Sequence, residues 1–392
     1  MNVRTGADRV LDERRGVLAG RRVGLLVNPT SVTSALDHLA LALPRLGVNV
    51  TTLFGPEHGV WGTEQDMAGV ESARDPLTGL PAHSLYGHTA ASLRPTPEML
   101  TDIDVLVYDV QDVGSRYYTF VYTMMLAMEA CADARIDMVV LDRPNPIGGL
   151  AVEGNVVHEG FSSFVGMHPL ATRHGMTAGE LALLFREERH IDVELEIVPM
   201  LGWRRGMHFD DTGVPWVNPS PNMPRPSTAL VYPGLCLLEG TNLSEGRGTT
   251  LPFEVFGAPW IEPPALADAL RDLPGCVPRP LWFRPTFQKH AGALCGGVQL
   301  HVTDRGAFAP VQAGLAVLVA ARRLWPEHFA WRREAYEFVG DRPAIDLLLG
   351  TSRLRALIEA GATVDDLVAE MEPDRQSFLD RRRPHLLYPE AP

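Results

Sequence analysis

Residues 23–54 read VGLLVNPTSVTSALDHLALALPRLGVNVTTLF, and their apolar residues change spacing twice. Val23–Val27 is a continuous apolar run bounded by polar residues, the pattern of a strand buried on both faces. Ser34–Leu46 carries apolar residues at helical spacing, and Val48–Phe54 has the pattern of a strand again. This stretch therefore predicts one strand–helix–strand unit.

The same alternation continues through the first half of the chain. Further strands and helices are predicted at Val105–Tyr108, Phe120–Ala132, Met138–Leu141, Thr177–Glu187 and Val193–Val198. Thr177 is the expected N-cap of its helix, because Glu180 three residues later completes a capping box. Strands alternating with helices favour an α/β fold, with a doubly wound parallel sheet covered by helices on both faces.

A proline-rich stretch, Trp203–Pro226, has no usable periodicity and indicates a crossing between domains. The sequence beyond it predicts a second, smaller α/β (α+β) domain, with elements near Pro264–Arg271, Gly297–Val302, Val311–Arg323 and Ser352–Ala360. We therefore expect one domain at residues 1–205 and another at residues 206–392.

Composition excludes several classes of protein. The 392 residues carry 35 Lys and Arg against 48 Asp and Glu, a net charge of −13, which repels nucleic acid and anionic membrane surfaces. The four cysteines are widely separated and have no metal-binding spacing, which favours a reducing compartment. Lys289 is the only lysine, a bias that we attribute to base composition.

The N-terminal sequence MNVRTGADRVLDERRG lacks the apolar core of a signal peptide. No apolar run approaches the length of a membrane span. We expect a cytoplasmic protein; action outside the cytoplasm would require a leader that has been removed.

Polar residues follow four of the predicted strands, and ligands of such sheets bind beyond the carboxyl ends of the strands. The four runs are Asn28–Ser31, Gly55–Glu64, Asp109–Tyr118 and Asp142–Pro146. Their convergence at one edge of the sheet predicts an active site there.

Glu57 lies between Pro56 and His58 on a turn flanked by glycines, where the backbone can approach a ligand closely. It is a candidate general acid or base, with a surface turn carboxylate as the alternative. His58 is a candidate second proton carrier, a packed imidazole or, least favoured, a metal ligand.

Asp109 and Asp112 follow the next strand, with Gln111 between them. Glycoside hydrolysis generally uses two carboxyl groups roughly 5–10 Å apart, and neighbouring strand ends are about 5 Å apart, so Glu57 and Asp112 form a reasonable pair. Arg116, Tyr117 and Tyr118 offer a cation and aromatic faces for a sugar that bears a carboxylate. The alternatives are that Asp109 caps the strand and that Tyr117 and Tyr118 are core residues.

Two loops of the second half carry further candidates. Asn218–Pro224 is locked by prolines and presents Asn222 on a rigid frame. Glu239–Thr250 places Glu245 and Arg247 between glycines, and we expect it to close over the cleft, with a solvated hairpin turn as the alternative. Neither a phosphate-binding glycine motif nor a G-x-S-x-G elbow is present, which disfavours a nucleotide cofactor and a serine hydrolase.

Several longer motifs, in this order, resemble the bacterial exo-β-N-acetylmuramidases, glycoside hydrolase family 171, formerly a domain of unknown function. They include TLFGPEHGVWG, VLVYDVQDVGSRYYTF, VVLDRPNPIGG, RHGMTAGELA, WVNPSPNMP and YPGLCLLEGTNLSEGRGTTLPFEVFGAPW. The resemblance runs from about Arg22 to Trp260.

The resemblance implies a Rossmann-like N-terminal domain, a smaller C-terminal α/β domain and an active site in the cleft between them. It also implies release of non-reducing-end N-acetylmuramic acid from peptidoglycan fragments without a nucleotide. Its motifs fall on Glu57, Asp112, Glu245 and Arg247. The missing export signal departs from many relatives and fits recycling of imported muropeptides.

Muramic acid differs from glucosamine by a lactyl group with a carboxylate, for which a positioned arginine is the natural partner. Arg116, Arg143 and Arg247 are the candidates. The second catalytic group is expected to be Asp112, Glu245 or the N-acetyl group of the substrate itself. The expected catalytic residues are thus Glu57, His58, Asp112 and Glu245, and the expected substrate-binding residues are Asn28, Glu64, Gln111, Arg116, Tyr117, Arg143, Asn145, Asn222 and Arg247.

Two other classes of function stay open at this point. A non-catalytic protein that binds muropeptides or other sugars would use the same two-domain cleft. A metal-dependent hydrolase would use His58, Asp109, Asp112 and His174. We expect no metal and no cofactor, a small oligosaccharide as the substrate, and no nucleic-acid or membrane partner.

Overall fold

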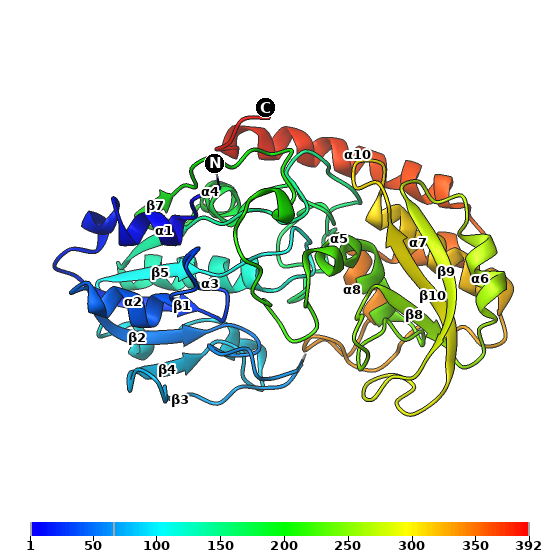
Figure 1. Ribbon diagram of the computed structural model, residues 1–392, viewed down its shortest axis with the longest axis horizontal. Coiled ribbons are helices and arrows are strands. Elements are labelled where there is room, and N and C mark those ends of the chain that lie inside the picture. Colours follow the sequence, from blue (N-terminus) through cyan, green and yellow to red (C-terminus); the bar gives the residue numbers. More distant parts are fainter. Residues whose placement is uncertain (1, 66, 391–392) are drawn as a thin grey trace.

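A seven-stranded sheet forms the centre of the larger of two lobes (Figure 1). The computed structural model describes residues 2–65 and 67–390. The strand order is β3-β4-β2-β1-β5-β6-β7, and every pairing is parallel except that of β3 with β4. The strands are β1 (Arg22–Val27), β2 (Asn49–Gly55), β3 (Ala73–Arg74), β4 (Pro81–Ser84), β5 (Val105–Asp109), β6 (Asp137–Leu141) and β7 (Leu195–Val198).

Helices cover both faces of this sheet because its central strands are apolar on both sides. Val23, Leu25 and Val27 pack with α1 (Gly6–Leu11) and α2 (Leu39–Arg45). Alternate residues such as Leu26 and Leu106 pack with the core that contains α3 (Phe120–Ala134) and α4 (Ala178–Glu188). The predicted α/β class and doubly wound sheet are confirmed, as is the Thr177 capping box at the start of α4.

One helix is much shorter than predicted. The pattern indicated Ser34–Leu46, whereas α2 begins at Leu39. Val32 forms an isolated bridge with His38, and the His38 side chain then accepts the amide hydrogen of Ala40 as the N-cap. Apolar spacing alone does not reveal this turn. The short strands β3, at the edge of the sheet, and β4, between β3 and β2, were not predicted either.

The smaller lobe is built on a three-stranded antiparallel sheet of order β8-β10-β9. The strands are β8 (Val255–Ala258), β9 (Cys276–Phe283) and β10 (Cys295–Val302), and α6 (Pro263–Ala269) and α7 (Pro310–Leu324) pack beside them. Only β10 was predicted. Pro278 and Pro280 obscure β9 in the sequence, and they are tolerated because β9 lies at the edge of the sheet.

Further helices complete this lobe: α5 (Pro226–Leu235), α8 (Ala344–Leu349), α9 (Ser352–Glu359) and α10 (Val364–Arg382). Helix α5 begins where the proline-rich crossing ends, with Pro226 in its first turn. It approaches α7 so closely that a Cβ atom on Gly314 would lie 2.2 Å from the carbonyl oxygen of Gly234. Within the described residues, no helix combines the length and apolar character needed to span a bilayer.

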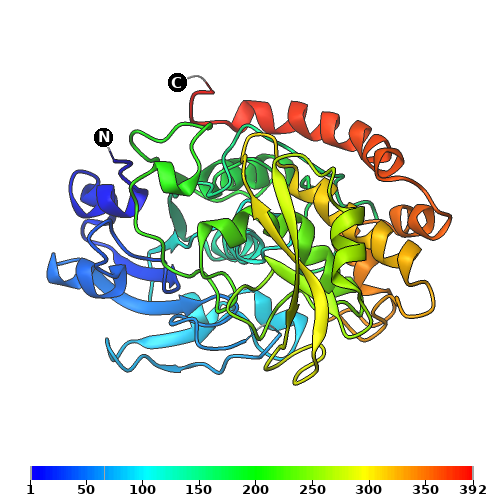
Figure 2. The same cartoon turned by 45° about the vertical axis from the view of Figure 1, so that its right-hand side comes forward.

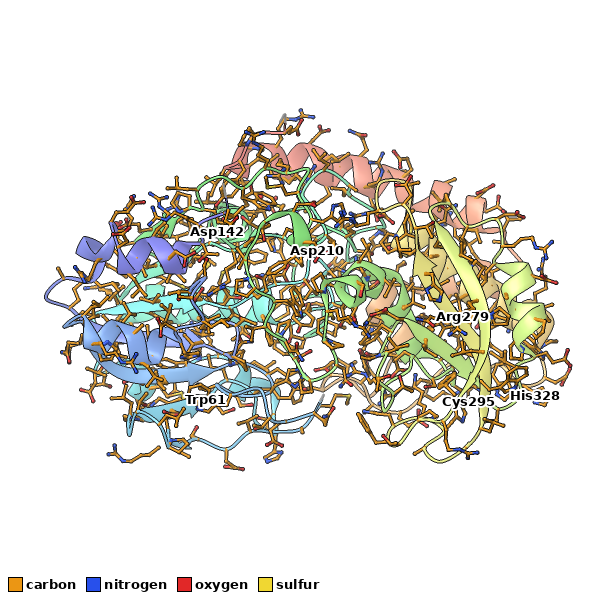
Figure 3. All side chains as sticks on the ribbon, in the orientation of Figure 1. Trp61, Asp142, Asp210, Arg279, Cys295 and His328 are labelled. Carbon is orange, nitrogen blue, oxygen red and sulfur yellow. The ribbon has the colours of Figure 1, made fainter. Side chains whose placement is uncertain are left out.

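The end of the chain returns to the larger lobe. Helix α10 runs along one edge of both lobes in two views (Figures 1 and 2). Beyond it, the Tyr388 hydroxyl donates to Asp142, which lies in the upper part of the larger lobe in Figure 3, and accepts the amide hydrogen of Met200. The expected boundary at residue 205 stays a prediction.

Asp142 makes the stability of this anchor dependent on pH. Burial raises the pKa of Asp142 to about 6, against hydrogen bonds from Tyr388, Gly179 and Thr177 that act in the opposite direction. An unfolded aspartate titrates near 4. The folded state therefore binds more protons between these values, and the contribution of Asp142 to stability is full below about pH 4 and is lost as the pH rises through about 6.

We predict that Asp142→Asn gains stability relative to the wild type as the pH rises from 4 to 7, because asparagine does not titrate. The gain is on the order of 2–3 kcal/mol. Denaturant unfolding of both proteins at the two pH values measures it. An unchanged difference between them would contradict the assignment.

Candidate active site

A pocket of about 510 Å³, counted with the solvent at its mouth, is lined by residues of both lobes. The segments that follow β2 and β5 contribute from the larger lobe, together with the loop between the lobes. The smaller lobe contributes from α5 and from the loops around residues 239–253 and 336–337. The lining residues are Glu57, His58, Tyr117, Tyr118, Thr119, Phe120, Val165, Ser220, Asn222, Met223, Tyr232, Glu239, Arg247, Phe253, Tyr336 and Glu337.

Glu57 is 6% exposed and is oriented by hydrogen bonds to both carboxylate oxygens. Its Oε2 accepts the hydroxyl hydrogen of Thr119 at 2.7 Å, and its Oε1 accepts the amide hydrogen of Met67 at 3.4 Å. The turn that carries it is left-handed at His58 (φ 71°) and Gly59 (φ 81°). A carboxyl group held in this way faces the pocket in one defined orientation.

His58 is fixed by the backbone and by an aromatic neighbour. Its Nδ1 lies 2.8 Å from the carbonyl oxygen of Glu64 and is therefore the protonated nitrogen. Its ring is nearly perpendicular to that of Phe120, with 6.3 Å between the two ring centroids. Glu64 contributes its backbone to this contact, while its side chain is exposed and does not line the pocket.

Aromatic rings form much of the pocket wall. The Tyr118 ring packs edge-on against the rings of Phe120 and Tyr232, with 4.8 and 5.7 Å between ring centroids. Tyr232 packs in the same way against Phe253, with 4.8 Å between ring centroids. Burial raises the pKa of both Tyr117 and Tyr118, so both remain protonated phenols. Such a wall offers apolar faces and hydroxyl groups, the surfaces on which sugars bind.

An ionic cluster lies on the side of the smaller lobe. Arg247 Nη2 lies 2.7 Å from Glu239 Oε1, and Arg247 Nε lies 3.4 Å from Glu245 Oε1. The Tyr336 hydroxyl donates to Glu239 at 2.6 Å, and Lys289 donates to Glu245 at 2.8 Å. Burial alone would raise the pKa of Glu239, but Arg247, Tyr336 and Lys289 lower it below the usual glutamate value.

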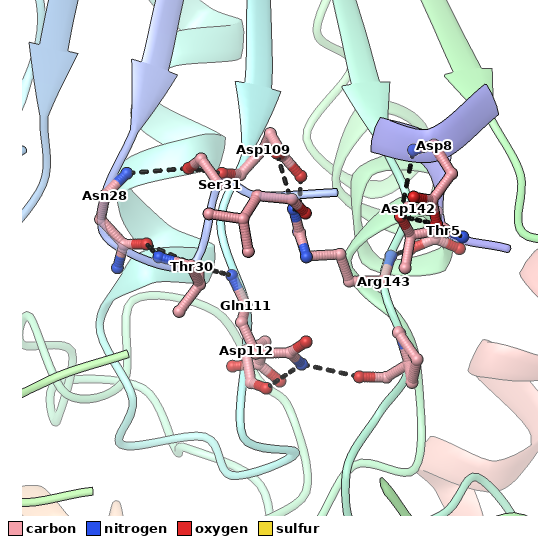
Figure 4. Close-up of polar contacts among 12 residues, drawn as sticks. Thr5, Asp8, Asn28, Thr30, Ser31, Asp109, Gln111, Asp112, Asp142 and Arg143 are labelled. Atoms are coloured by element: carbon pink, nitrogen blue, oxygen red, sulfur yellow. Dashed lines mark hydrogen bonds and ion pairs between the residues drawn. The ribbon is translucent and has the colours of Figure 1, made fainter. Parts of the chain in front are cut away.

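The polar side chains directly after β1, β5 and β6 bind one another and do not line the pocket (Figure 4). Asn28 Oδ1 accepts from the amide and hydroxyl of Thr30, and the Thr30 hydroxyl accepts the amide hydrogen of Gln111. Arg143 binds both oxygens of Asp109, at 2.5 and 2.8 Å. These contacts join the loops that leave neighbouring strands.

Asp112 and Asn145 also make internal contacts. Asp112 Oδ2 accepts the amide hydrogen of Gly114 at 2.7 Å and lies 3.2 Å from His174 Nε2. Asn145 donates to the carbonyl oxygen of Met176, and the Gln111 amide donates to that of Pro144. None of these side chains lines the pocket.

Arg116 is fully buried between the two lobes. Its guanidinium donates to the carbonyl oxygens of Asn155 (2.6 Å), Leu170 (3.1 Å) and Leu348 (2.6 Å), and burial lowers its pKa. Leu348 belongs to the last turn of α8, so the cation also satisfies a carbonyl group at a helix C-terminus. The next residue, Tyr117, lines the pocket.

The structure thus brings together only some of the expected site residues. Glu57, His58, Tyr117, Asn222 and Arg247 line the pocket, whereas Asn28, Glu64, Gln111, Asp112, Arg116, Arg143, Asn145 and Glu245 do not. The catalytic and binding roles of all these residues stay predictions.

Several lining residues were missed by the sequence analysis. Thr119, Ser220 and Glu239 lie inside the motifs that carry the family resemblance, but nothing in the sequence singles them out as site residues. Tyr118, which the sequence offers with Tyr117 as an aromatic face, also lines the pocket. Tyr336 and Glu337 lie in no motif, and only the fold brings them to the pocket, where the Tyr86 hydroxyl of the larger lobe donates to Glu337 at 3.1 Å.

A metal centre was one of the open alternatives. Across residues 2–65 and 67–390, no group of three or more His, Cys, Asp or Glu side chains is arranged to hold a metal ion. Of the four residues considered, Asp109 binds Arg143 and Asp112 lies beside His174.

Two family models match nearly the whole chain. "Exo-beta-N-acetylmuramidase NamZ, N-terminal" matches residues 23–227, and the corresponding C-terminal model matches residues 230–388. The chain is 46% identical over 389 residues to the peptidoglycan beta-N-acetylmuramidase NamZ of Bacillus subtilis (strain 168), covering 98% of this chain and 91% of that protein.

Two solved structures share the fold. Both are DUF1343 family proteins from Bacteroides fragilis NCTC 9343. One has a TM-score of 0.89 and 36% identity and covers 99% of each chain; the other has a TM-score of 0.77 and 29% identity and covers 100% of each.

A buried carboxylate in an aromatic-walled pocket between two lobes is the kind of site in which an enzyme binds a small ligand, and the family matches make that enzyme a glycosidase. The chain belongs to the exo-β-N-acetylmuramidase NamZ family, a family of glycosidases. This finding confirms the family resemblance of the sequence motifs. The two family models meet between residues 227 and 230, close to the start of α5.

We predict that Arg116→Met lowers stability without changing substrate preference. The substitution leaves three buried carbonyl groups without their donors, at a cost of about 1–3 kcal/mol each at most. Denaturant unfolding measures the loss, and the ratio of kcat/KM for a muramic and a glucosaminide substrate measures preference. A changed ratio at full stability would give Arg116 a direct role in binding.

Proposed function

We propose that this protein is an exo-β-N-acetylmuramidase, which releases N-acetylmuramic acid from the non-reducing end of peptidoglycan fragments. The observation that carries the proposal is Glu57, a buried carboxylate that is oriented on both oxygens and faces an aromatic-walled pocket. The 46% identity to a protein named peptidoglycan beta-N-acetylmuramidase supports the choice of substrate.

Glu57 acts as the general acid that protonates the departing glycosidic oxygen. Thr119 holds the carboxyl group toward the pocket, and burial in an aromatic wall keeps bulk water away from the transferred proton. Asp112 and Glu245 themselves lie outside the pocket wall. Asp112 contacts Gly114 and His174, and Glu245 contacts Lys289 and Arg247. The N-acetyl oxygen of the substrate is then our preferred nucleophile at the anomeric carbon.

Arg247 is our candidate for binding the lactyl carboxylate. Of the three arginines considered, Arg116 donates to three carbonyl oxygens, and Arg143 donates through Nε and Nη2 to the two carboxylate oxygens of Asp109. Arg247 alone among these three lines the pocket that contains Glu57.

We further propose that the enzyme acts in the cytoplasm on imported muropeptides or on the disaccharide of N-acetylmuramic acid and N-acetylglucosamine. All four cysteines are free and buried, an arrangement compatible with a reducing compartment. Fractionation of cells that express the full chain tests the location.

Product analysis with that disaccharide tests the function directly. We expect free N-acetylmuramic acid and N-acetylglucosamine, and proton NMR in the first minutes reports the anomer formed. Participation of the N-acetyl group requires retention of configuration. Binding without turnover would instead support a non-catalytic sugar-binding protein.

We predict that Glu57→Gln lowers kcat by several orders of magnitude, because an amide cannot donate an acidic proton. The fold should be intact, since the two side chains have nearly the same shape. Steady-state kinetics on a chromogenic muramic glycoside measures the effect. Glu71→Gln, an exposed carboxylate further along the same loop, is the matched control and should behave as wild type. Activity near the wild-type level in Glu57→Gln would reject the assignment.

We predict that Arg247→Met lowers kcat/KM for a muramic glycoside about 10- to 100-fold more than for the corresponding glucosaminide, which lacks the carboxylate. Arg247→Lys should restore only part of the preference, because an ammonium cannot form the planar two-point contact. Equal losses of kcat/KM on both substrates would show that Arg247 does not bind the lactyl carboxylate.

A further inference from the structure

Lys289 is the only lysine among 35 basic residues, and all the others are arginine. Base composition accounts for the abundance of arginine but gives no reason why one lysine was kept. The surroundings of Lys289 supply a physical reason.

The Lys289 ammonium uses three donors at once. Nζ donates to the carbonyl oxygen of Leu238 (2.8 Å), to that of Leu243 (2.9 Å) and to Glu245 Oε2 (2.8 Å). An ammonium directs its three hydrogens tetrahedrally from one atom, whereas a guanidinium spreads its donors in a plane. Arginine therefore cannot make the same three contacts from this position.

These contacts support the pocket wall from behind. Lys289 ties together the two ends of the segment 238–243 and holds Glu245, whose other oxygen lies 3.4 Å from Arg247 Nε. Arg247 in turn lies 2.7 Å from Glu239, and both of these residues line the pocket. Positive and negative side chains thus alternate from Lys289 through Glu245 and Arg247 to Glu239 at the pocket.

The charges along this chain also depend on Lys289. With Lys289 present, Glu245 is shared between two cations; without it, the full charge of Glu245 falls on Arg247. A more strongly neutralised Arg247 attracts a substrate carboxylate less, in a buried setting where such effects are large. Glu245 is 2% exposed and Arg247 is 8% exposed.

We propose that Lys289 is a positioning residue that sets the place and the available charge of Arg247, and thereby the selectivity for sugars that bear a carboxylate. This inference rests on the proposed function, because it assigns the specificity of the same pocket. Lys289 itself lies outside the pocket wall and touches no reacting atom.

Substitutions at position 289 test the proposal by kinetics on paired muramic and glucosaminide substrates. Lys289→Met should raise KM for the muramic substrate about tenfold or more, with kcat and the glucosaminide kinetics nearly unchanged. Lys289→Arg, which keeps the charge but not the three-donor geometry, should restore little of the selectivity. The double variant Glu245→Gln/Lys289→Met, which removes both charges, should regain part of it.

Arg333→Met is the matched control. Arg333 is exposed and lines the same surface hollow as Lys289, so its substitution removes one positive charge nearby without touching Glu245. Its selectivity should equal that of the wild type.

Chemical modification provides a measurement that does not depend on the folding of a variant. Lys289 has a side chain 19% exposed to solvent, and apart from the α-amino group it is the only primary amine in the chain. Acetylation of the folded wild type by an N-hydroxysuccinimide ester forms an amide at Nζ and releases N-hydroxysuccinimide. Loss of muramic selectivity should follow the extent of acetylation at Lys289 measured by mass spectrometry.

Three outcomes would overturn the proposal: wild-type selectivity in Lys289→Met, full rescue by Lys289→Arg, or equal losses on both substrates accompanied by a lowered Tm. Absence of turnover by the wild type would instead reject the proposed function. In that case, calorimetric binding of N-acetylmuramic acid and N-acetylglucosamine to the wild type and to Lys289→Met still tests the role of Lys289.

Discussion

The pocket depends most on the hydrogen bonds that the buried guanidinium of Arg116 donates to backbone carbonyl oxygens. The guanidinium binds carbonyl oxygens from two loops of the larger lobe and from the last turn of α8 in the smaller lobe. The residues that follow it, Tyr117 to Phe120, line the pocket. Because a single planar group donates to three carbonyl oxygens of both lobes, the pocket loop is fixed to both lobes at once.

The strand ends of the larger sheet divide two tasks between them. The turn after β2 carries Glu57 into the pocket, while the loops after β1 and β6 bind the first residues of the loop after β5, through pairs such as Arg143 with Asp109. The loop after β5 does both, because its later residues, Tyr117 to Thr119, line the pocket. Loops at the ends of parallel strands expose backbone groups that need partners, and polar side chains supply them. A rigid frame of this kind keeps the Thr119–Glu57 hydrogen bond in a constant geometry.

The smaller lobe adds charge to this frame. Arg247 lies between Glu239 and Glu245, and Lys289 pairs with Glu245 on the side away from Arg247 and outside the pocket wall. Each of these charges lies beside an opposite one, which is the condition under which the buried members, Glu239, Glu245 and Arg247, are tolerated away from water. The specificity proposed for the pocket therefore depends on residues that contact no substrate.

The sequence by itself determined the class of fold and the position of most central elements. The apolar runs of β1, β5 and β6 and the Thr177 capping box are local signals, so they could be read without the fold. The motif around Glu57 likewise marked a candidate acid. The edge strand β9 escaped notice because its prolines are acceptable only at a sheet edge, which is a tertiary property.

Only the tertiary structure decided which polar residues meet in the pocket. The sequence gives no reason to distinguish Arg116, Arg143 and Arg247. In the structure, Arg116 donates to three carbonyl oxygens, Arg143 binds Asp109, and Arg247 lines the pocket. The partner of a long charged side chain is chosen by what lies within reach after folding. Sequence separation carries no information about that distance.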